Sequence, residues 1–220
     1  MALLPLRGVG ESLLDQKSSL DQKILMARKH QYTTSDYVEW DVAMNLVRRL
    51  YRDGDYRMSL LIGCGCFFGL RYSDLSRLTW EQLLTGNSFT IIEQKTGKRR
   101  EIRINSGFQA HIKDCHAAMC IQDSKAPCFL NRFGDIMSNQ IVNRHFKSIK
   151  VRYQIRIRNF STHSLRKTFG RRVVDMAGAD AEMALIKLSE IFNHASPLVT
   201  RRYLGLRQEE LGEVYDRLQF

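Results

Sequence analysis

The stretch Ile191-Phe-Asn-His-Ala-Ser-Pro-Leu-Val-Thr-Arg-Arg-Tyr203 places a tyrosine nine residues after a histidine. Upstream of it lie Gly69-Leu-Arg71, Lys95 and His163-Ser-Leu-Arg166. Two arginines, a lysine and two histidines can neutralise and protonate a reacting phosphodiester, and a tyrosine hydroxyl can attack it as an oxygen nucleophile. Each residue alone also fits a structural role, such as a helix cap, a solvated turn or a core side chain. As an ordered set, they predict phosphate chemistry.

The charge balance favours a polyanionic partner. The chain has 220 residues, of which 44% are hydrophobic, as expected for one folded domain with a short extension. Its 34 Lys and Arg outweigh 23 Asp and Glu, so the formal net charge is +11. Nucleic acid is the leading candidate partner for so basic a chain.

The apolar segments predict neither a membrane span nor a secretory signal. The longest apolar run, around residues 60–70, is interrupted by three glycines. The first seven residues lack the basic start and the sustained apolar stretch of a signal peptide. We therefore expect a cytoplasmic protein that is associated with the nucleoid when it binds DNA.

The cysteines and histidines do not predict a metal site. Five cysteines without a regular framework suit a reducing compartment. His111 and Cys115, like His116 and Cys120, are four residues apart, a spacing that can place two ligands on one helix face. No CxxC or HExxH motif accompanies them, and the same segment carries an ordinary apolar stripe. We therefore expect neither a metal nor another cofactor.

Hydrophobic periodicity predicts a mainly α-helical domain with a small antiparallel β-sheet, an α+β fold. A start signal at Thr33-Thr-Ser-Asp36 predicts a helix that closes near Asp53-Gly54. A glycine-containing turn between β-favouring runs predicts a hairpin over residues 88–104, with Lys95 at its tip. Alternating apolar and basic residues over 151–158 predict a strand with one basic face. The other predicted helices cover 56–68, 107–121, 138–150, 162–177, 181–192 and 197–204, followed by one in the tail.

We divide the chain into three segments. Residues 1–32 are an N-terminal extension or linker, with a near-repeat over 12–23 that has too few copies for a repeat fold. Residues 33–206 form the main domain, and 207–220 form an amphipathic tail helix. The apolar stripe of that helix consists of Leu211, Val214, Tyr215 and Leu218. Its pattern predicts a packing role for Tyr215, the other late tyrosine.

A long basic stretch overlaps the candidate chemistry. From residue 136 to residue 174 there are ten Lys or Arg and no Asp or Glu. A short run of this kind is usually a solvated face, but this one crosses several predicted elements. We expect it to contact DNA, where such charge contributes salt-dependent, sequence-independent affinity. The expected DNA-binding residues are Arg144, Lys147, Lys150, Arg152, Arg156, Arg158, Lys167 and Arg171.

Taken in order, these motifs resemble the catalytic domain of the tyrosine recombinases of the phage integrase type. The segment Gly69 to Leu75 resembles the first arginine box, with Asp74 where glutamate is commoner. Lys95 resembles the hairpin lysine, and His163-Ser-Leu-Arg166 matches the His-x-x-Arg box. Asn193-His194 resembles the Gly-His pair, with asparagine in place of glycine. Tyr203 lies at the spacing of the nucleophile, and the resemblance covers about residues 33–206.

The resemblance implies a role for each residue. Tyr203 would attack DNA and form a 3′-phosphotyrosyl bond. Arg71 and Arg166 would bind the non-bridging oxygens, and His163 would help to activate the tyrosine. Lys95 would protonate the leaving 5′ oxygen. His194 would donate a hydrogen bond to the phosphate. Asp74 would orient the histidine or arginine side chains.

The resemblance implies a site-specific recombinase or integrase of a mobile genetic element, working without cofactors as four protomers on two double-stranded DNA sites. Two other functions stay open, a type IB topoisomerase and a non-catalytic DNA-binding regulator. The target site and the choice among integration, excision, inversion and dimer resolution also stay open. Tyrosine recombinases usually carry a DNA-clamping domain before the catalytic one, and residues 1–32 are too short for it. Either a catalytic fragment or a minimal enzyme fits this length.

Overall fold

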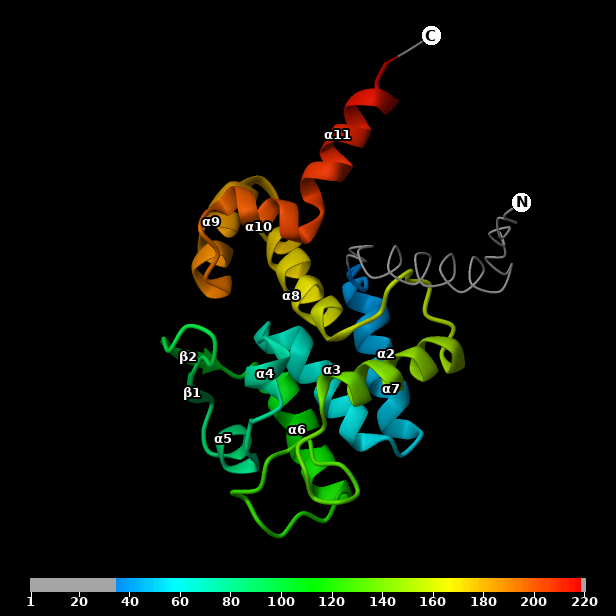
Figure 1. Ribbon diagram of the computed structural model, residues 1–220, viewed down its shortest axis with the longest axis vertical. Helices are drawn as coiled ribbons and strands as arrows, with labels where there is room; N and C mark the ends of the chain where they lie inside the picture. Colours follow the sequence, from blue (N-terminus) through cyan, green and yellow to red (C-terminus); the bar gives the residue numbers. More distant parts are fainter. Residues whose placement is uncertain (1–34, 219–220) are drawn as a thin grey trace, which may run out of the picture. The chain divides into compact units, whose positions relative to one another are not determined.

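The computed structural model describes residues 35–218, and this part of the chain is mainly helical with one two-stranded sheet (Figure 1). The predicted fold class is confirmed. The elements are α2 (Trp40–Arg52), α3 (Tyr56–Phe68), α4 (Tyr72–Leu75), α5 (Trp80–Leu84), β1 (Ser88–Ile92), β2 (Arg99–Arg103), α6 (Ser106–Ala118), α7 (Asn139–Arg152), α8 (Thr162–Ala177), the 3-10 helix η1 (Gly178–Asp180), α9 (Ala181–Phe192), α10 (Pro197–Leu204) and α11 (Leu206–Asp216). Within residues 35–218, no helix combines the length and apolarity needed to cross a bilayer.

Helix α3 lies at the centre of the larger core. Apart from Arg57 its residues are apolar or small, and most of them are buried because α2, α6 and α8 pack around it. A Cβ atom on Gly63 would lie 2.5 Å from the ring of Phe108, and one on Gly65 would lie 2.5 Å from the side chain of Leu165. The glycines that interrupt this apolar run are therefore positions of close packing.

A smaller core lies where α8, α9 and α10 meet. Its buried members are Val174, Leu185, Leu188, Phe192 and Leu204. Gly170 on α8 permits the contact, since a Cβ atom there would lie 2.6 Å from Leu204 and 3.1 Å from the ring of Phe192. This packing holds α10 against α8, and these two helices carry the tyrosine and the His-x-x-Arg motif.

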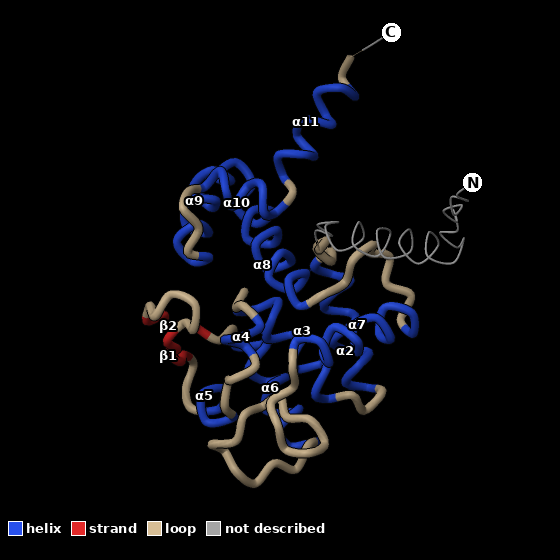
Figure 2. The backbone as a smooth tube through the Cα atoms, viewed as in Figure 1, coloured by secondary structure: helices blue, strands red, loops and turns tan. Residues whose placement is uncertain are grey.

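The predicted hairpin is present and carries Lys95 in its turn. Strands β1 and β2 pair antiparallel, from Ser88 opposite Arg103 to Ile92 opposite Arg99 (Figure 2). The backbone N–H of Glu93 donates to the carbonyl of Lys98 at 2.9 Å, which closes the turn below Lys95. The hairpin thus holds the lysine on a short, closed loop.

The strand predicted over residues 151–158 is wrong. Helix α7 continues to Arg152, and Gln154 ends it with a φ of 54°. Residues 155–158 have no regular structure, although the side chain of Ile155 is buried. Asp53, just after α2, accepts hydrogen bonds from the Tyr153 hydroxyl at 2.7 Å and from Arg152 at 3.1 Å. The alternation therefore reflects a helix end followed by a loop anchored to α2.

The predicted start of the first helix is also corrected. Helix α2 begins at Trp40 and ends at Arg52, before Asp53 as predicted. Asp36 does not cap this helix, because its carboxylate accepts from the backbone N–H of Asn159 at 3.1 Å. Thr33, Thr34 and the near-repeat over 12–23 lie outside the described residues.

The tail contains a helix, as predicted, but leaves its stripe uncovered. Helix α11 extends from the end of α10 (Figure 1). The exposed fractions are 53% for Leu211, 59% for Val214, 72% for Tyr215 and 72% for Leu218. Leu206, at the start of α11, packs against the smaller core, and two acids also contact the domain: Glu209 pairs with Arg171 at 2.6 Å and Glu210 pairs with Arg201 at 3.3 Å. The apolar stripe is thus free to meet another surface.

Candidate active site

Tyr203 projects from α10 into the smaller core. Helix α10 starts at Pro197, a residue suited to the first helical position. The ring of Tyr203 packs edge-on against Phe192, at 5.7 Å between centroids, and against His194, at 5.2 Å. The ammonium group of Lys167 lies 5.3 Å from the centroid of the Tyr203 ring. Helices α8, α9 and α10 therefore fix the tyrosine together.

Arg166 is the most buried cation of the site, with 3% of its surface exposed. Its Nη1 donates to the carbonyl of Gly69 at 2.6 Å, and its Nη2 donates to the carbonyl of Phe192 at 3.0 Å. The guanidinium also lies 4.1 Å from the centroid of the Phe192 ring. Burial lowers the pKa of Arg166 to about 10, so the group stays charged at neutral pH.

Arg71 meets Arg166 at the same backbone oxygen. Its Nη2 donates to the carbonyl of Phe192 at 2.9 Å, and its Nη1 pairs with Glu93 at 3.1 Å. Gly69, two residues earlier, has a φ of 58°, and a Cβ atom there would lie 2.4 Å from the ring of Phe169. Glycine is the residue that tolerates both conditions. The Gly-Leu-Arg motif therefore turns the chain tightly at the end of α3 and aims Arg71 at the end of α9.

The Tyr203 hydroxyl is shielded from solvent between these cations. Burial raises the pKa of Tyr203, while the charges of Arg166 and Arg71 act to lower it. Arg166 is close enough to influence that pKa, but its Nη1 and Nη2 are directed at backbone carbonyls. Within residues 35–218, the hydroxyl has no hydrogen-bond partner of standard geometry. In this state the tyrosine is a protonated group whose polar atom is not committed elsewhere.

His163 stands at the edge of the site, where α8 begins. Ser161 caps this helix by accepting from the backbone N–H of His163. The imidazole helps to line an open cleft of about 510 Å³ that also includes Arg71 and Gln94. Partial burial, followed by the charges of Arg166 and neighbouring cations, lowers the pKa of His163. The neutral form is therefore favoured at neutral pH, and a neutral imidazole can accept a proton.

His194 occupies the short connection between α9 and α10. Its Nδ1 lies 3.0 Å from the hydroxyl oxygen of the buried Thr200. Burial, with the charges of Arg166, Arg71 and Lys95, lowers the pKa of His194 to about 4. Lys95 is exposed on the hairpin turn, and its charge makes the smallest contribution to the lowered pKa of His194.

The asparagine that replaces the usual glycine has a local explanation. Asn193 ends α9 with φ 50° and ψ 51°, a left-handed conformation that asparagine tolerates better than most side chains. Its side-chain oxygen accepts from Lys98 Nζ at 2.7 Å, which links the segment between α9 and α10 to the hairpin. The substitution therefore keeps the turn and adds a contact that glycine cannot make.

Asp74 lies beneath the hairpin rather than in the open cleft. Its exposed fraction is 6%, and its Oδ1 accepts from the backbone N–H of Gln94 at 2.8 Å. Its Oδ2 is buried and has no hydrogen-bond partner within the described residues. Asp74 thus links the first arginine motif to the residue just before Lys95.

Glu93 is a site residue that sequence reasoning missed. It is 3% exposed, and its Oε2 accepts from Arg71 at 3.1 Å and from Thr96 at 2.9 Å. Its Oε1 lies 3.7 Å from Nη1 of Arg100, another overlooked cation. Arg100 also donates to the carbonyl of Phe68 at 2.9 Å. A glutamate with two arginines nearby in three dimensions, but not along the chain, leaves no signal in a single sequence.

The predicted DNA-binding residues fall into three groups. Arg144 and Lys147 on α7, and Arg156 and Arg158 in the loop after it, are exposed. Lys167 instead lies over the ring of Tyr203. Others make intramolecular contacts: Lys150 with the carbonyl of Arg158 (3.0 Å), Arg152 with Asp53 (3.1 Å) and Arg171 with Glu209 (2.6 Å). The basic stretch therefore does not act as one uniform surface.

The His111 segment packs into the larger core. His111 Nε2 lies 3.0 Å from the hydroxyl of the buried Ser59 and 3.5 Å from Sγ of Cys115. Trp80 packs edge-on against His116 at 4.9 Å between centroids. The part of the chain that the structure covers contains no cluster of three or more His, Cys, Asp or Glu that could hold a metal ion.

The sequence that carries these residues resembles that of known proteins. Residues 41–210 match the phage integrase family. The chain belongs to that family. A tyrosine recombinase XerC from Pelobacter propionicus is 29% identical over 153 residues, or 68% of this chain and 47% of that protein. The chain thus spans about half the length of the XerC relatives that it matches.

Solved structures show the same fold. XerA recombinase has a TM-score of 0.62 at 19% identity, over 84% of this chain and 66% of that one. XerH site-specific recombinase, in a post-cleavage complex with a palindromic difH substrate, has a TM-score of 0.60 at 18% identity, over 84% and 54%. The expected tyrosine recombinase catalytic-domain fold is confirmed.

Proposed function

We propose that this phage integrase family chain cuts and rejoins DNA at specific sites through a covalent bond to Tyr203. One observation carries the proposal. The shielded Tyr203 hydroxyl lies beside Arg166, and Arg166 and Arg71 converge on one carbonyl, that of Phe192. Two guanidinium groups held this close create a position for a group with two anionic oxygens. A phosphodiester that displaces these internal hydrogen bonds would present its phosphorus to the tyrosine.

The proposed reaction balances without a metal or a nucleotide. Tyr203 Oη attacks phosphorus, and His163 accepts the hydroxyl proton in its neutral form. The bond from phosphorus to the 5′ oxygen breaks, and Lys95 supplies the proton that makes a 5′ hydroxyl. Attack by a 5′ hydroxyl from another strand reverses these steps and rejoins the DNA. The phosphotyrosyl linkage conserves the energy of the broken bond.

The remaining site residues support the transition state. Arg71 and Arg166 bind the non-bridging oxygens, where charge builds up in the pentacoordinate state. If the Thr200 hydroxyl donates to Nδ1 of His194, the imidazole proton lies on Nε2 and can be donated to the phosphate. Asp74 orients the hairpin through the backbone of Gln94.

DNA would reach the site across the exposed cations. Arg144, Lys147 and Arg156 belong to the acid-free stretch 136–174, which also contains His163 and Arg166. We assign these exposed residues, together with Arg158, the contacts to the phosphate backbone. Two fold relatives support this partner, because XerH is bound to its difH substrate and Tn1549 transposon integrase is in complex with transposon right end DNA. The second of them also supports a mobile-element substrate.

The tail points to an assembly of several copies. Leu211, Val214 and Tyr215 on α11, and Leu218 just after it, are each more than half exposed, although a helix of this kind usually covers its apolar face. We assign it to a groove on a neighbouring protomer in a four-protomer complex on two DNA sites. Deleting residues 208–220 should preserve folding and single-site cleavage but reduce recombination between two sites. Normal two-site recombination by the deletion variant would remove the tail from assembly.

Covalent capture from a random pool tests the proposed activity without a known target site. Duplexes with a randomised segment and a fixed nick lose the short strand after cleavage, so the protein remains attached to DNA. Denaturation followed by sequencing should recover adducts enriched in one sequence, with none from the Tyr203→Phe variant. Adducts without sequence enrichment, combined with relaxation of supercoiled plasmid, would indicate a topoisomerase. Binding without any adduct would indicate a non-catalytic regulator.

A further inference from the structure

We propose that Glu93 is a positioning residue that couples Arg71 to the hairpin carrying Lys95. The proposal rests on the function assigned above. Glu93 lies at the base of the turn, where its backbone N–H donates to the carbonyl of Lys98 and its carbonyl accepts from Gly97 at 2.8 Å. Its side chain binds the arginine of a different element. One residue thus contacts both the phosphate-binding arginine and the loop of the proton donor.

The contacts of Glu93 are those of a fixed group. The side chain is 4% exposed, and its Oε2 accepts from both Arg71 Nη1 and Thr96 Oγ1. Arg100 lies against the other oxygen and is itself anchored to the carbonyls of Phe68 and Ile191. A carboxylate that accepts two hydrogen bonds and pairs with a second, anchored guanidinium has little freedom to move. The guanidinium of Arg71 is therefore placed with respect to the hairpin, and not only with respect to its own helix.

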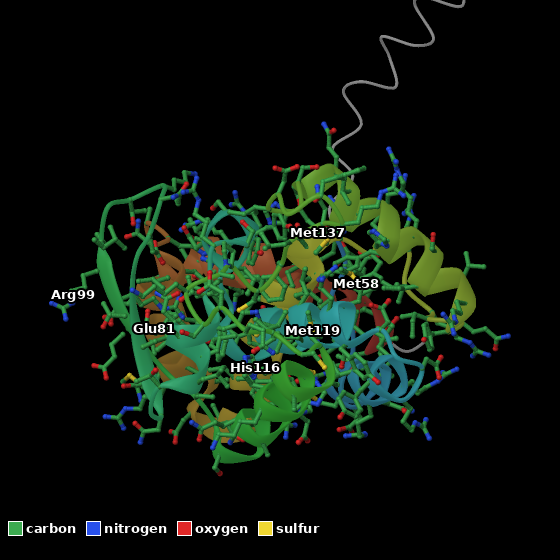
Figure 3. The ribbon with its side chains drawn as sticks, turned by 90° about the horizontal axis from the view of Figure 1, so that it is seen from below. Met58, Glu81, Arg99, His116, Met119 and Met137 are labelled. Carbon is green, nitrogen blue, oxygen red and sulfur yellow. The ribbon has the colours of Figure 1, made fainter. Side chains whose placement is uncertain are left out.

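The alternation of side chains along β2 explains why Arg100 points towards Glu93 while its neighbour does not. Arg99, at the start of β2, points away into solvent (Figure 3), whereas the side chain of the next residue, Arg100, is 17% exposed. A second link runs parallel to the first, because Asp74 accepts from the backbone of Gln94. Two acids thus join the first arginine motif to the hairpin: Glu93 belongs to the hairpin and binds Arg71, and Asp74 belongs to the motif and binds the backbone of Gln94.

The charge of Glu93 suits this role. Arg71, Arg100 and Arg166 are all largely buried within one small region, and like charges so placed repel each other. Glu93 offsets part of that repulsion while leaving Arg71 Nη2 on a backbone carbonyl, a weaker partner than a phosphate. When a phosphate arrives, Arg71 can give up the carbonyl and keep Glu93. The hairpin, and Lys95 with it, then keeps its position relative to the bound phosphate.

Glu93→Gln tests the coupling, with Glu101→Gln as the matched control on the exposed side of the same hairpin. The measurement is single-turnover cleavage of a nicked duplex, with and without sulfur in place of the bridging 5′ oxygen. A sulfur leaving group needs no proton donor. We expect Glu93→Gln to slow cleavage of normal DNA roughly tenfold to a hundredfold, as small misplacements of reacting groups do. The Glu93→Gln variant should bind DNA with unchanged affinity, and the sulfur-substituted DNA should restore most of its cleavage rate. The Glu101→Gln variant should cleave normal DNA at the rate of the parent protein.

Other outcomes decide against the coupling. Equal rates for Glu93→Gln and Glu101→Gln would overturn it, and so would a slow Glu93→Gln variant that sulfur does not rescue. If Glu93→Gln does not fold, Thr96→Val removes one donor to the carboxylate and retains every charge. That variant should be slowed less but rescued in the same way, and an unaffected Thr96→Val would overturn the proposal. Absence of cleavage by the unmodified protein would instead refute the proposed function, which separates the two failures.

Discussion

The cations of the site and the cations of α7 carry the same charge but are held in opposite ways. Arg166 is 3% exposed and bonded to two backbone carbonyls, and Arg71 shares one of them. Arg144 and Lys147 on α7 lie in solvent. A buried, tethered guanidinium has a defined direction, whereas an exposed cation contributes mainly to the electrostatic field. The first group is therefore suited to a transition state and the second to binding.

Replacing either site arginine by lysine should produce the largest effect. Arg166→Lys and Arg71→Lys keep the charge but lose the planar pair of donors. We expect single-turnover cleavage to fall by about 10²–10³-fold, the usual cost of losing a preorganised donor to a developing charge. DNA affinity, measured in the same buffer, should change little. Parallel losses of affinity and cleavage would make these residues ordinary phosphate anchors and erase the distinction between the two groups.

His194, in the same site, should make the stability of the protein depend on pH. Because the pKa of His194 falls from 6.5 to about 4 on folding, the unfolded chain takes up a proton first as pH decreases. The contribution of neutral His194 to stability is present above about pH 6.5 and is lost towards about pH 4. Thermal unfolding of His194→Gln should therefore depend less on pH across this window than unfolding of the parent chain.

His145→Gln, which changes an exposed histidine on α7, is the control for that experiment. It should retain the pH dependence of the parent chain. If both substitutions flatten the curve equally, the effect does not come from the buried site.

Single exposed cations should have the smallest effects. Lys147→Ala and Arg144→Ala should each weaken binding modestly and reduce the slope of log affinity against log salt by about 1. Lys113→Ala, an exposed change on α6, serves as the comparison because that helix lies outside the basic stretch. Arg152 is already paired with Asp53, so its removal should matter less than that of Lys147. Equal effects of Lys113→Ala and Lys147→Ala would argue against α7 as the DNA-facing helix.

Periodic and local features of the fold were predictable from the sequence. The buried helix α3 and the hairpin have clear patterns, and the structure has both. The prediction of a strand over 151–158 was wrong because a helix end followed by a loop can show the same alternation of apolar and basic residues. The contact of Asp53 with Tyr153, which fixes the helix end, is not visible in the sequence. The predicted start of α2 was wrong because Asp36 does not cap the helix. Its carboxylate accepts a hydrogen bond from Asn159, more than a hundred positions away. Long-range hydrogen bonds of this kind are invisible to local periodicity.

In the candidate site, too, features with a local sequence pattern were predictable and features that depend on long-range contacts were not. Ordered motifs identified Arg71, Arg166 and Tyr203, and the structure brings them together. Glu93 was missed because its partners lie on other elements, and the inward turn of Arg100 depends on strand register. The role of Lys167 was assigned to the DNA surface, although its ammonium faces the ring of Tyr203. Motifs therefore locate reacting groups, whereas the groups that position them emerge only from the fold.

Mapping the covalent linkage tests the central claim most directly. A nicked duplex carrying the captured sequence would be reacted, digested with protease and analysed by mass spectrometry. We predict that the nucleotide-bearing peptide contains Tyr203, and that Tyr203→Phe yields no adduct while binding the same duplex. A linkage to Tyr72, whose hydroxyl donates to the carbonyl of Met137 beside the cleft, or to Tyr215 on the exposed tail, would contradict the account. So would an adduct that persists in Tyr203→Phe.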